Sequence, residues 1–165
     1  MPLNPAMQYS AEALKNLTEN FEGLNLNAYG DSTGIPTIGY GSILYQDGTK
    51  VKMGDVITQQ QADDLLLWEI GLKAASVNQQ LNVQVSQHEF DALTDLEYNV
   101  GCGAIMHSSL LRYLNSGDEK DFYAQFLVWD HAGGKVIAGL LRRRQADMKW
   151  AMTPDGLPDA SNTTV

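Results

Sequence analysis

The chain has 165 residues, 44% hydrophobic and 19% charged, which is typical of a globular protein with one domain. Its formal net charge of −9 argues against a general nucleic-acid binder, because phosphate contacts need lysine and arginine. The single cysteine, Cys102, excludes an internal disulfide. The N-terminus lacks the pattern of a signal peptide, and no apolar stretch is long enough to span a bilayer. We therefore expect synthesis in the cytoplasm and no stable membrane insertion.

The first predicted element is a helix that begins after Ser10, a favourable N-cap, and ends near Glu22-Gly23. Its apolar stripe consists of Leu14, Leu17 and Phe21. Residues 24–45 are rich in glycine and in short β-favouring runs, which predicts a hairpin or small twisted sheet. A turn is expected at residues 46–48.

The rest of the chain is predicted to be helical. Thr58 to Gln61 has the form of a capping box and opens a long helix to about Leu81. Ser86 to Glu89 is a second capping box, and the helix behind it ends at Gly101. Further helices fit residues 108–115, 119–130 and 138–151, and a loose tail is expected from Thr153.

Two carboxyl groups near the front of the chain lie in contrasting local environments. Glu22 follows the predicted first helix, where the helix dipole and nearby apolar residues favour a protonated carboxyl, as a general acid requires. Asp31 lies in a Gly-Asp-Ser-Thr-Gly turn, whose backbone N–H groups favour the ionised form. Thr37, on the predicted next strand, offers a hydroxyl that can hold a water. Glycoside hydrolysis uses such a pair of carboxyls.

Each of these residues also has an ordinary explanation. A glutamate at a helix end is most often solvated, an aspartate in a turn most often serves turn geometry, and a strand threonine is nearly always structural. The combination and its spacing therefore carry the hypothesis. The three histidines and Cys102 show no metal-ligand spacing, so no cofactor or metal is expected.

The segment from Glu22 through Asp31 and Thr37 to Gly41 closely resembles the active-site segment of phage-type lysozymes, glycoside hydrolase family 24. In that family an aspartate follows the glutamate by nine positions and a threonine follows six later. The likeness covers about residues 10–151 and continues in Met53-Gly54-Asp55, Phe90-Asp91-Ala92-Leu93, Tyr98-Asn99-Val100-Gly101-Cys102-Gly103, Ser109-Leu110-Leu111, Trp129, Gly133-Gly134-Lys135 and 139–144 through Trp150.

The resemblance implies an α+β, lysozyme-like, two-lobed fold. A small N-terminal lobe of about residues 10–57, with a short antiparallel sheet, would join a helical lobe of about 58–151 through a long helix. The muramidase domain would span residues 1–151, and 152–165 would form the tail. The cleft between the lobes would bind a glycan strand.

The resemblance also implies hydrolysis of the β-1,4 bond between N-acetylmuramic acid and N-acetylglucosamine in peptidoglycan. Glu22 would protonate the leaving oxygen, Asp31 would stabilise the developing positive charge and help activate water, and Thr37 would position that water. Inversion is the family expectation and needs the two carboxyls about 6.5–9.5 Å apart.

Other roles follow from position in the family's motifs. Gly41, Ile43, Tyr98 and Asn99 are candidate substrate-binding residues, although core packing is an equal alternative for Ile43 and Tyr98. One of the arginines 142–144 is expected to pair with a carboxylate and support Glu22. Ser42 stands where the family usually has a histidine in a structural ion pair, so a difference in stability is expected.

The predicted protein is a monomeric endolysin, made in the host cytoplasm and acting on the cell wall in the periplasm, with a holin for release. Two alternatives stay open at this point. One is an exported antibacterial muramidase with an immunity protein, and the other is a non-catalytic peptidoglycan-binding module.

Overall fold

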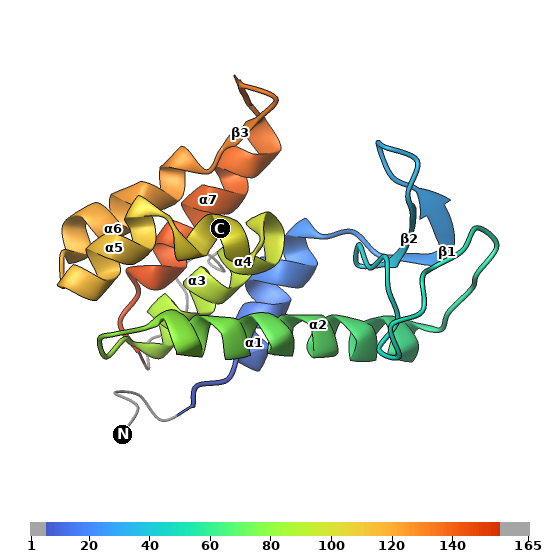
Figure 1. Ribbon diagram of the computed structural model, residues 1–165, viewed down its shortest axis with the longest axis horizontal. Helices are drawn as coiled ribbons and strands as arrows, with labels where there is room; N and C mark the ends of the chain where they lie inside the picture. Colours follow the sequence, from blue (N-terminus) through green and yellow to red (C-terminus); the bar gives the residue numbers. More distant parts are fainter. Residues whose placement is uncertain (1–5, 156–165) are drawn as a thin grey trace, which may run out of the picture.

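The computed structural model describes residues 6–155 (Figure 1). Most helices gather at one end, a two-stranded sheet lies at the other, and one long helix runs between them. The elements are α1 (Ala11–Ala13), η1 (Leu14–Glu19), β1 (Asn25–Gly30), β2 (Pro36–Gly39), α2 (Gln59–Gln80), α3 (Gln87–Val100), α4 (Cys102–Met106), α5 (Ser109–Ser116), α6 (Glu119–Gln125), η2 (Phe126–Val128), β3 (His131–Ala132), β4 (Lys135–Val136) and α7 (Ala138–Ala151). The mixed α+β fold expected from the sequence is confirmed.

The first helix begins as predicted, because the Ser10 side chain accepts a hydrogen bond from the Ala13 N–H. The sequence predicted a regular α-helix here, which was wrong, because η1 is a π-helix. The last helical residue of this segment is Phe21. The wider π-turn holds one residue more than an α-turn. It places two consecutive side chains, Leu17 and Thr18, in the interior, where they are 2% and 0% exposed.

The two-stranded sheet is an antiparallel hairpin. Tyr29 pairs with Thr37 and Gly30 with Pro36, so residues 31–35 form its connection. After β2 the chain turns sharply, with mutual backbone hydrogen bonds of 2.9 Å between Ile38 and Ser42. This turn needs glycine at position 41, where φ is +111°.

Capping boxes define the two longest helices, as predicted. In α2 the Thr58 hydroxyl accepts from Gln61 N–H, and the Gln61 side chain accepts from Thr58 N–H. Ser86 and Glu89 make the same reciprocal pair at α3. Gly71 does not interrupt α2, although glycine costs about 1 kcal/mol relative to alanine inside a helix.

The main hydrophobic core is built around α3. Residues 88–97 of this helix are all buried, and it packs against α2 and α7. Burial of a side chain such as Phe90 or Leu96, both 0% exposed, contributes about 1.5–3 kcal/mol. Two smaller clusters, around Ile38 and Leu66, join the N-terminal half of α2 to the β region.

Three features of the helical region differ from the sequence-based prediction. The helix predicted over residues 119–130 ends earlier, as α6 followed by the 3₁₀ turn η2. The short helix α4 and the hairpin β3–β4 were not predicted. The hairpin forms around Gly133 and Gly134, whose φ values of +57° and +76° suit a two-residue turn. Of the predicted tail, residues 156–165 lie outside the described residues.

Removing the N-cap of α2 should destabilise the protein measurably. Thr58→Ala deletes the acceptor for the Gln61 N–H, and we expect a loss of about 1 kcal/mol in the free energy of unfolding. Urea denaturation measures this loss. Thr58→Ser keeps the hydroxyl and should stay near wild type, whereas an equal loss in both variants would contradict the capping role.

Candidate active site

A cavity of about 500 Å³ lies where the β2 loop, α2 and α3 meet. This volume suits a ligand the size of a sugar unit or larger. It contains Glu22 and all four residues that the sequence predicted to bind substrate. Its lining is Glu22, Tyr40, Gly41, Ile43, Leu44, Trp68, Glu69, Leu72, Lys73, Tyr98 and Asn99. Asp31 and Thr37 are not part of this lining and lie on the adjacent hairpin.

Glu22 occupies the first position after the end of the first helix. Its N–H still donates to the Thr18 carbonyl at 2.9 Å, which fixes the backbone at this position. One carboxylate oxygen, Oε1, accepts a hydrogen bond from Arg143 Nη1. The other, Oε2, lies 3.8 Å from the place that a Cβ at residue 41 would occupy. The absence of a side chain at Gly41 therefore leaves space beside Oε2.

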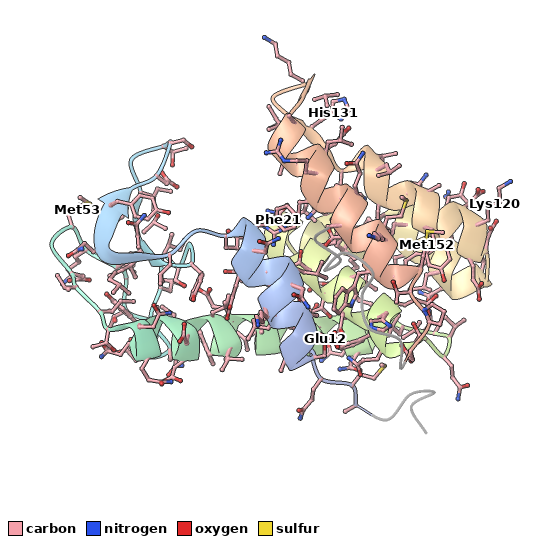
Figure 2. The ribbon with its side chains drawn as sticks, turned by 180° about the vertical axis from the view of Figure 1, so that it is seen from behind. Glu12, Phe21, Met53, Lys120, His131 and Met152 are labelled. Carbon is pink, nitrogen blue, oxygen red and sulfur yellow. The ribbon has the colours of Figure 1, made fainter. Side chains whose placement is uncertain are left out.

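Arg143 is the arginine that contacts Glu22, which answers a question that the sequence left open. Its Nε and Nη2 bind both oxygens of Asp95, at 3.0 and 3.1 Å. Burial by itself lowers the pKa of Arg143, but the carboxylates of Asp95 and Glu22 outweigh burial and raise it. The Arg143 guanidinium also lies 5.9 Å from the ring centre of Phe21, within range of a cation–π interaction. Phe21 is labelled in Figure 2, at the end of the first helix that faces the helical region.

Asp31 is held by the hairpin connection. Its Oδ1 accepts hydrogen bonds from the Thr33 hydroxyl at 2.8 Å, the Thr33 N–H at 2.8 Å and the Ile35 N–H at 2.9 Å. The Thr33 hydroxyl, and then these backbone groups, lower the pKa of Asp31 below its ordinary value. Asp31 is therefore an ionised carboxylate at neutral pH, with its orientation set by the turn.

Thr37 lies at the same end of the hairpin as Asp31. It is 4% exposed, and its hydroxyl donates to the Ile35 carbonyl at 2.9 Å. Because the hydroxyl hydrogen is used there, the oxygen lone pairs are available to accept a hydrogen bond, for instance from a water. The turn residue Ile35 thus connects to both Asp31 and Thr37 and fixes them relative to each other.

A second carboxylate in the cavity, Glu69, was not predicted from the sequence. Its Oε2 accepts from the Ser42 hydroxyl at 2.9 Å, and the Tyr98 hydroxyl lies at 3.4 Å. Burial raises the pKa of Glu69, and the Ser42 and Tyr98 hydroxyls partly oppose this. Burial, and then the charge of Glu69, raises the pKa of Tyr98. Ser42 therefore forms a neutral-to-carboxylate hydrogen bond at the position where the family resemblance implied an ion pair.

The spacing of residues on α2 could have revealed these missed positions. Trp68, Glu69, Leu72 and Lys73 are three to four residues apart, which places them on one face of a helix. That face carries both apolar and charged residues and lines the cavity.

Asn99, one of the predicted substrate-binding residues, is oriented by Arg144. The Nη1 group of Arg144 donates to the Oδ1 of Asn99 at 3.0 Å.

Within residues 6–155, no three histidine, cysteine or carboxylate side chains are grouped so that they could hold a metal ion. In the same part of the chain, no helix has both the length and the apolar character needed to cross a membrane.

Comparisons with known proteins identify the family of the chain. The sequence profile described as "Phage lysozyme" matches residues 19–147, and the chain belongs to the phage lysozyme family. It is 41% identical over 157 residues to an endolysin of Bacillus phage PZA, matching 92% of this chain and 57% of that protein. It is 35% identical to the endolysin of Salmonella phage P22, over 84% of this chain and 94% of that protein.

The fold also matches that of a solved relative. The endolysin from Escherichia coli O157:H7 phage FAHEc1 superposes with a TM-score of 0.82 at 39% identity, covering 88% of this chain and 94% of that chain. The chain spans little more than half of the curated relatives from Bacillus phages PZA and B103. Those proteins are therefore longer than the domain described here.

The half-buried Glu69 should make stability depend on pH. Its pKa is raised in the folded state, so ionisation costs folding free energy as pH rises above the ordinary carboxyl value of 4.5. We expect Glu69→Gln to match wild type near pH 4 and to become increasingly more stable than wild type as pH rises toward about 8. Urea denaturation across this range measures the difference.

Asp64→Asn is the matched control, because Asp64 lies on the same helix but is exposed. Its difference from wild type should stay constant over the same pH range. If Glu69→Gln instead lost stability progressively as pH rises, Glu69 would be stabilised as an anion, and the assigned effect of burial would be wrong.

Proposed function

We propose that this protein is a muramidase that hydrolyses the β-1,4 bond between N-acetylmuramic acid and N-acetylglucosamine in peptidoglycan and so lyses the phage host. The observation that carries the proposal is the position of Glu22. One of its oxygens is bound by Arg143, while the other faces the space left by Gly41 at the edge of the cavity. A carboxyl group placed in this way can deliver a proton to an oxygen of a bound glycan.

The three residues of the hypothesis have separate tasks. Glu22 is the general acid that protonates the leaving glycosidic oxygen. Asp31, ionised and fixed by Thr33 and Ile35, stabilises the oxocarbenium-like transition state and helps to activate the attacking water. Thr37 accepts a hydrogen bond from that water through the lone pairs left by its own bond to Ile35. Attack from the face opposite the leaving group inverts the anomeric carbon.

The cavity residues provide the glycan contacts. Gly41 allows close approach of a sugar to Glu22, and Ile43, which is 45% exposed, offers an apolar contact for a sugar ring. Tyr98 and Asn99 supply polar groups from the end of α3. The glycan strand then lies along the face of α2 that carries Trp68 and Lys73.

The names of relatives support a role in lysis. Several are called endolysins, and others, from phages such as P21, are called SAR-endolysins. We infer that this protein acts as a monomer on the wall from the periplasmic side and reaches it through a holin. An exported antibacterial muramidase would use the same chemistry, and an immunity protein encoded beside it would identify that case. A non-catalytic binding module is less consistent with the Glu22, Asp31 and Thr37 set.

Replacing the proposed acid should remove activity without unfolding the protein. For Glu22→Gln we expect lysis of permeabilised Gram-negative cells to slow by at least about 100-fold, since general acids contribute roughly 10²–10⁴-fold. Clearing of turbidity measures the rate, and thermal unfolding checks the fold. Glu12→Gln, an exposed change on the first helix, should remain fully active. Clearing by Glu22→Gln at the wild-type rate would refute the proposed acid.

The products should identify the reaction as hydrolysis with inversion. We expect mass analysis of digested muropeptides to show reducing ends that carry one added water, and proton NMR of the first products to show the α-anomer. Anhydro ends would mean that no water attacks and would contradict the role of Asp31. An initial β-anomer would mean retention. Binding to peptidoglycan without any products would favour the non-catalytic module.

A further inference from the structure

The arginine that contacts Glu22 is held mainly by another residue. Asp95 on α3 is 0% exposed and binds Arg143 side-on through both of its oxygens, at 3.0 and 3.1 Å. Asp95 Oδ1 also accepts from the Thr18 hydroxyl at 2.7 Å. The Thr18 oxygen lies 2.9 Å from the Tyr9 hydroxyl. Asp95 thus directs Nη1, the one guanidinium nitrogen that it does not bind, toward Glu22.

This arrangement matters because Glu22 must change its charge during the proposed reaction. A guanidinium remains charged at all relevant pH values, and Arg143 is only 4% exposed. If Glu22 were its sole partner, each protonation of Glu22 would leave a buried cation without a counter-charge, which is strongly unfavourable. Arg143 would then hold Glu22 in the ionised form and suppress its function as an acid.

The other charged and titratable groups around Glu22 do not provide this counter-charge. From α2, Glu69 is bound to Ser42, and Lys73 lies near Glu69 in the same cavity. From α3, the Tyr98 hydroxyl faces Glu69 and the Tyr40 carbonyl. From α7, the fully buried Asp147 lies 2.9 Å from Arg144 and also faces Asp95; burial, and then the charge of Asp95, raise the pKa of Asp147 well above its ordinary value.

We propose that Asp95 is a positioning residue that supplies the permanent counter-charge of Arg143, so that Glu22 can carry the catalytic proton while its arginine partner stays paired. The inference rests on the proposed role of Glu22 as the acid. Two functions are then divided between two carboxylates. Asp95 keeps Arg143 paired and in place, whereas Glu22 is left to donate the catalytic proton.

The pH dependence of activity in Asp95→Asn tests the proposal. The amide keeps the size of the side chain but removes its charge, so that Glu22 becomes the one carboxylate of the described residues that is hydrogen-bonded to Arg143. We expect the alkaline limb of the kcat profile to move to lower pH by about one unit or more, the usual effect of an unshared opposite charge. The kcat at neutral pH should fall about tenfold or more and recover at lower pH. The KM should stay nearly unchanged.

Asp91→Asn is the matched control. Asp91 is also 0% exposed on α3, one turn before Asp95, but it binds Ser10 and Gln87 instead of Arg143. This variant removes the same charge from the same helix, and its alkaline limb should coincide with that of wild type. A limb unchanged in Asp95→Asn, or a loss of activity that is equal at all pH values, would overturn the proposal.

A titration of the wild-type protein gives an answer even if Asp95→Asn does not fold. Carbon-13 NMR of labelled carboxyl groups should show Glu22 taking up a proton while Asp95 remains ionised. The reverse order would overturn the proposal. Failure of the proposed function would give a different result from failure of this inference. The wild-type protein would then release no muropeptides, but the order in which Glu22 and Asp95 take up protons could still be measured.

Discussion

The site depends on one guanidinium shared by two carboxylates. Arg143 joins α7 to α3 through Asp95 and to the end of the first helix through Glu22. These three segments are far apart in the chain, so the shared ion pair fixes their relative positions inside the helical region. Because it is buried, the network is costly unless every member is paired, and this requirement fixes the direction of the Glu22 side chain.

The β region is attached to this rigid base by α2. The small core clusters around Ile38 and Leu66 hold the turn after β2 against the N-terminal half of that helix. Gly41 lies in this turn, with a φ of +111° that favours glycine, and its missing side chain opens the space beside Glu22. A substitution at position 41 would therefore strain the turn and fill the site at once. The turn serves both the fold and the chemistry.

Local signals account for what the sequence could predict. The capping boxes at Thr58 and Ser86 fix helix starts through contacts within four residues, and both were placed correctly. The π-helix at 14–19 and the short helix α4 depend on tertiary packing, and local patterns did not reveal them. Glu22 was identified from its place at a helix end and from the resemblance to the family's motif, and Gly41 from that resemblance. Asp95 and Glu69 were missed because their roles arise from partners 48 and 27 residues away.

Burial of charged groups also changes what the acidic composition means for the proposed function. Within residues 6–155, six carboxylates and two arginines are buried, namely Glu89, Asp91, Asp95, Glu97, Asp130, Asp147, Arg143 and Arg144. Charges in the interior organise α3 and α7 and are far less effective than surface charges in repelling a distant anionic polymer. The formal charge of −9 therefore overstates the negative charge at the protein surface. One of these interior carboxylates, Asp95, belongs to the network that holds Arg143 beside Glu22.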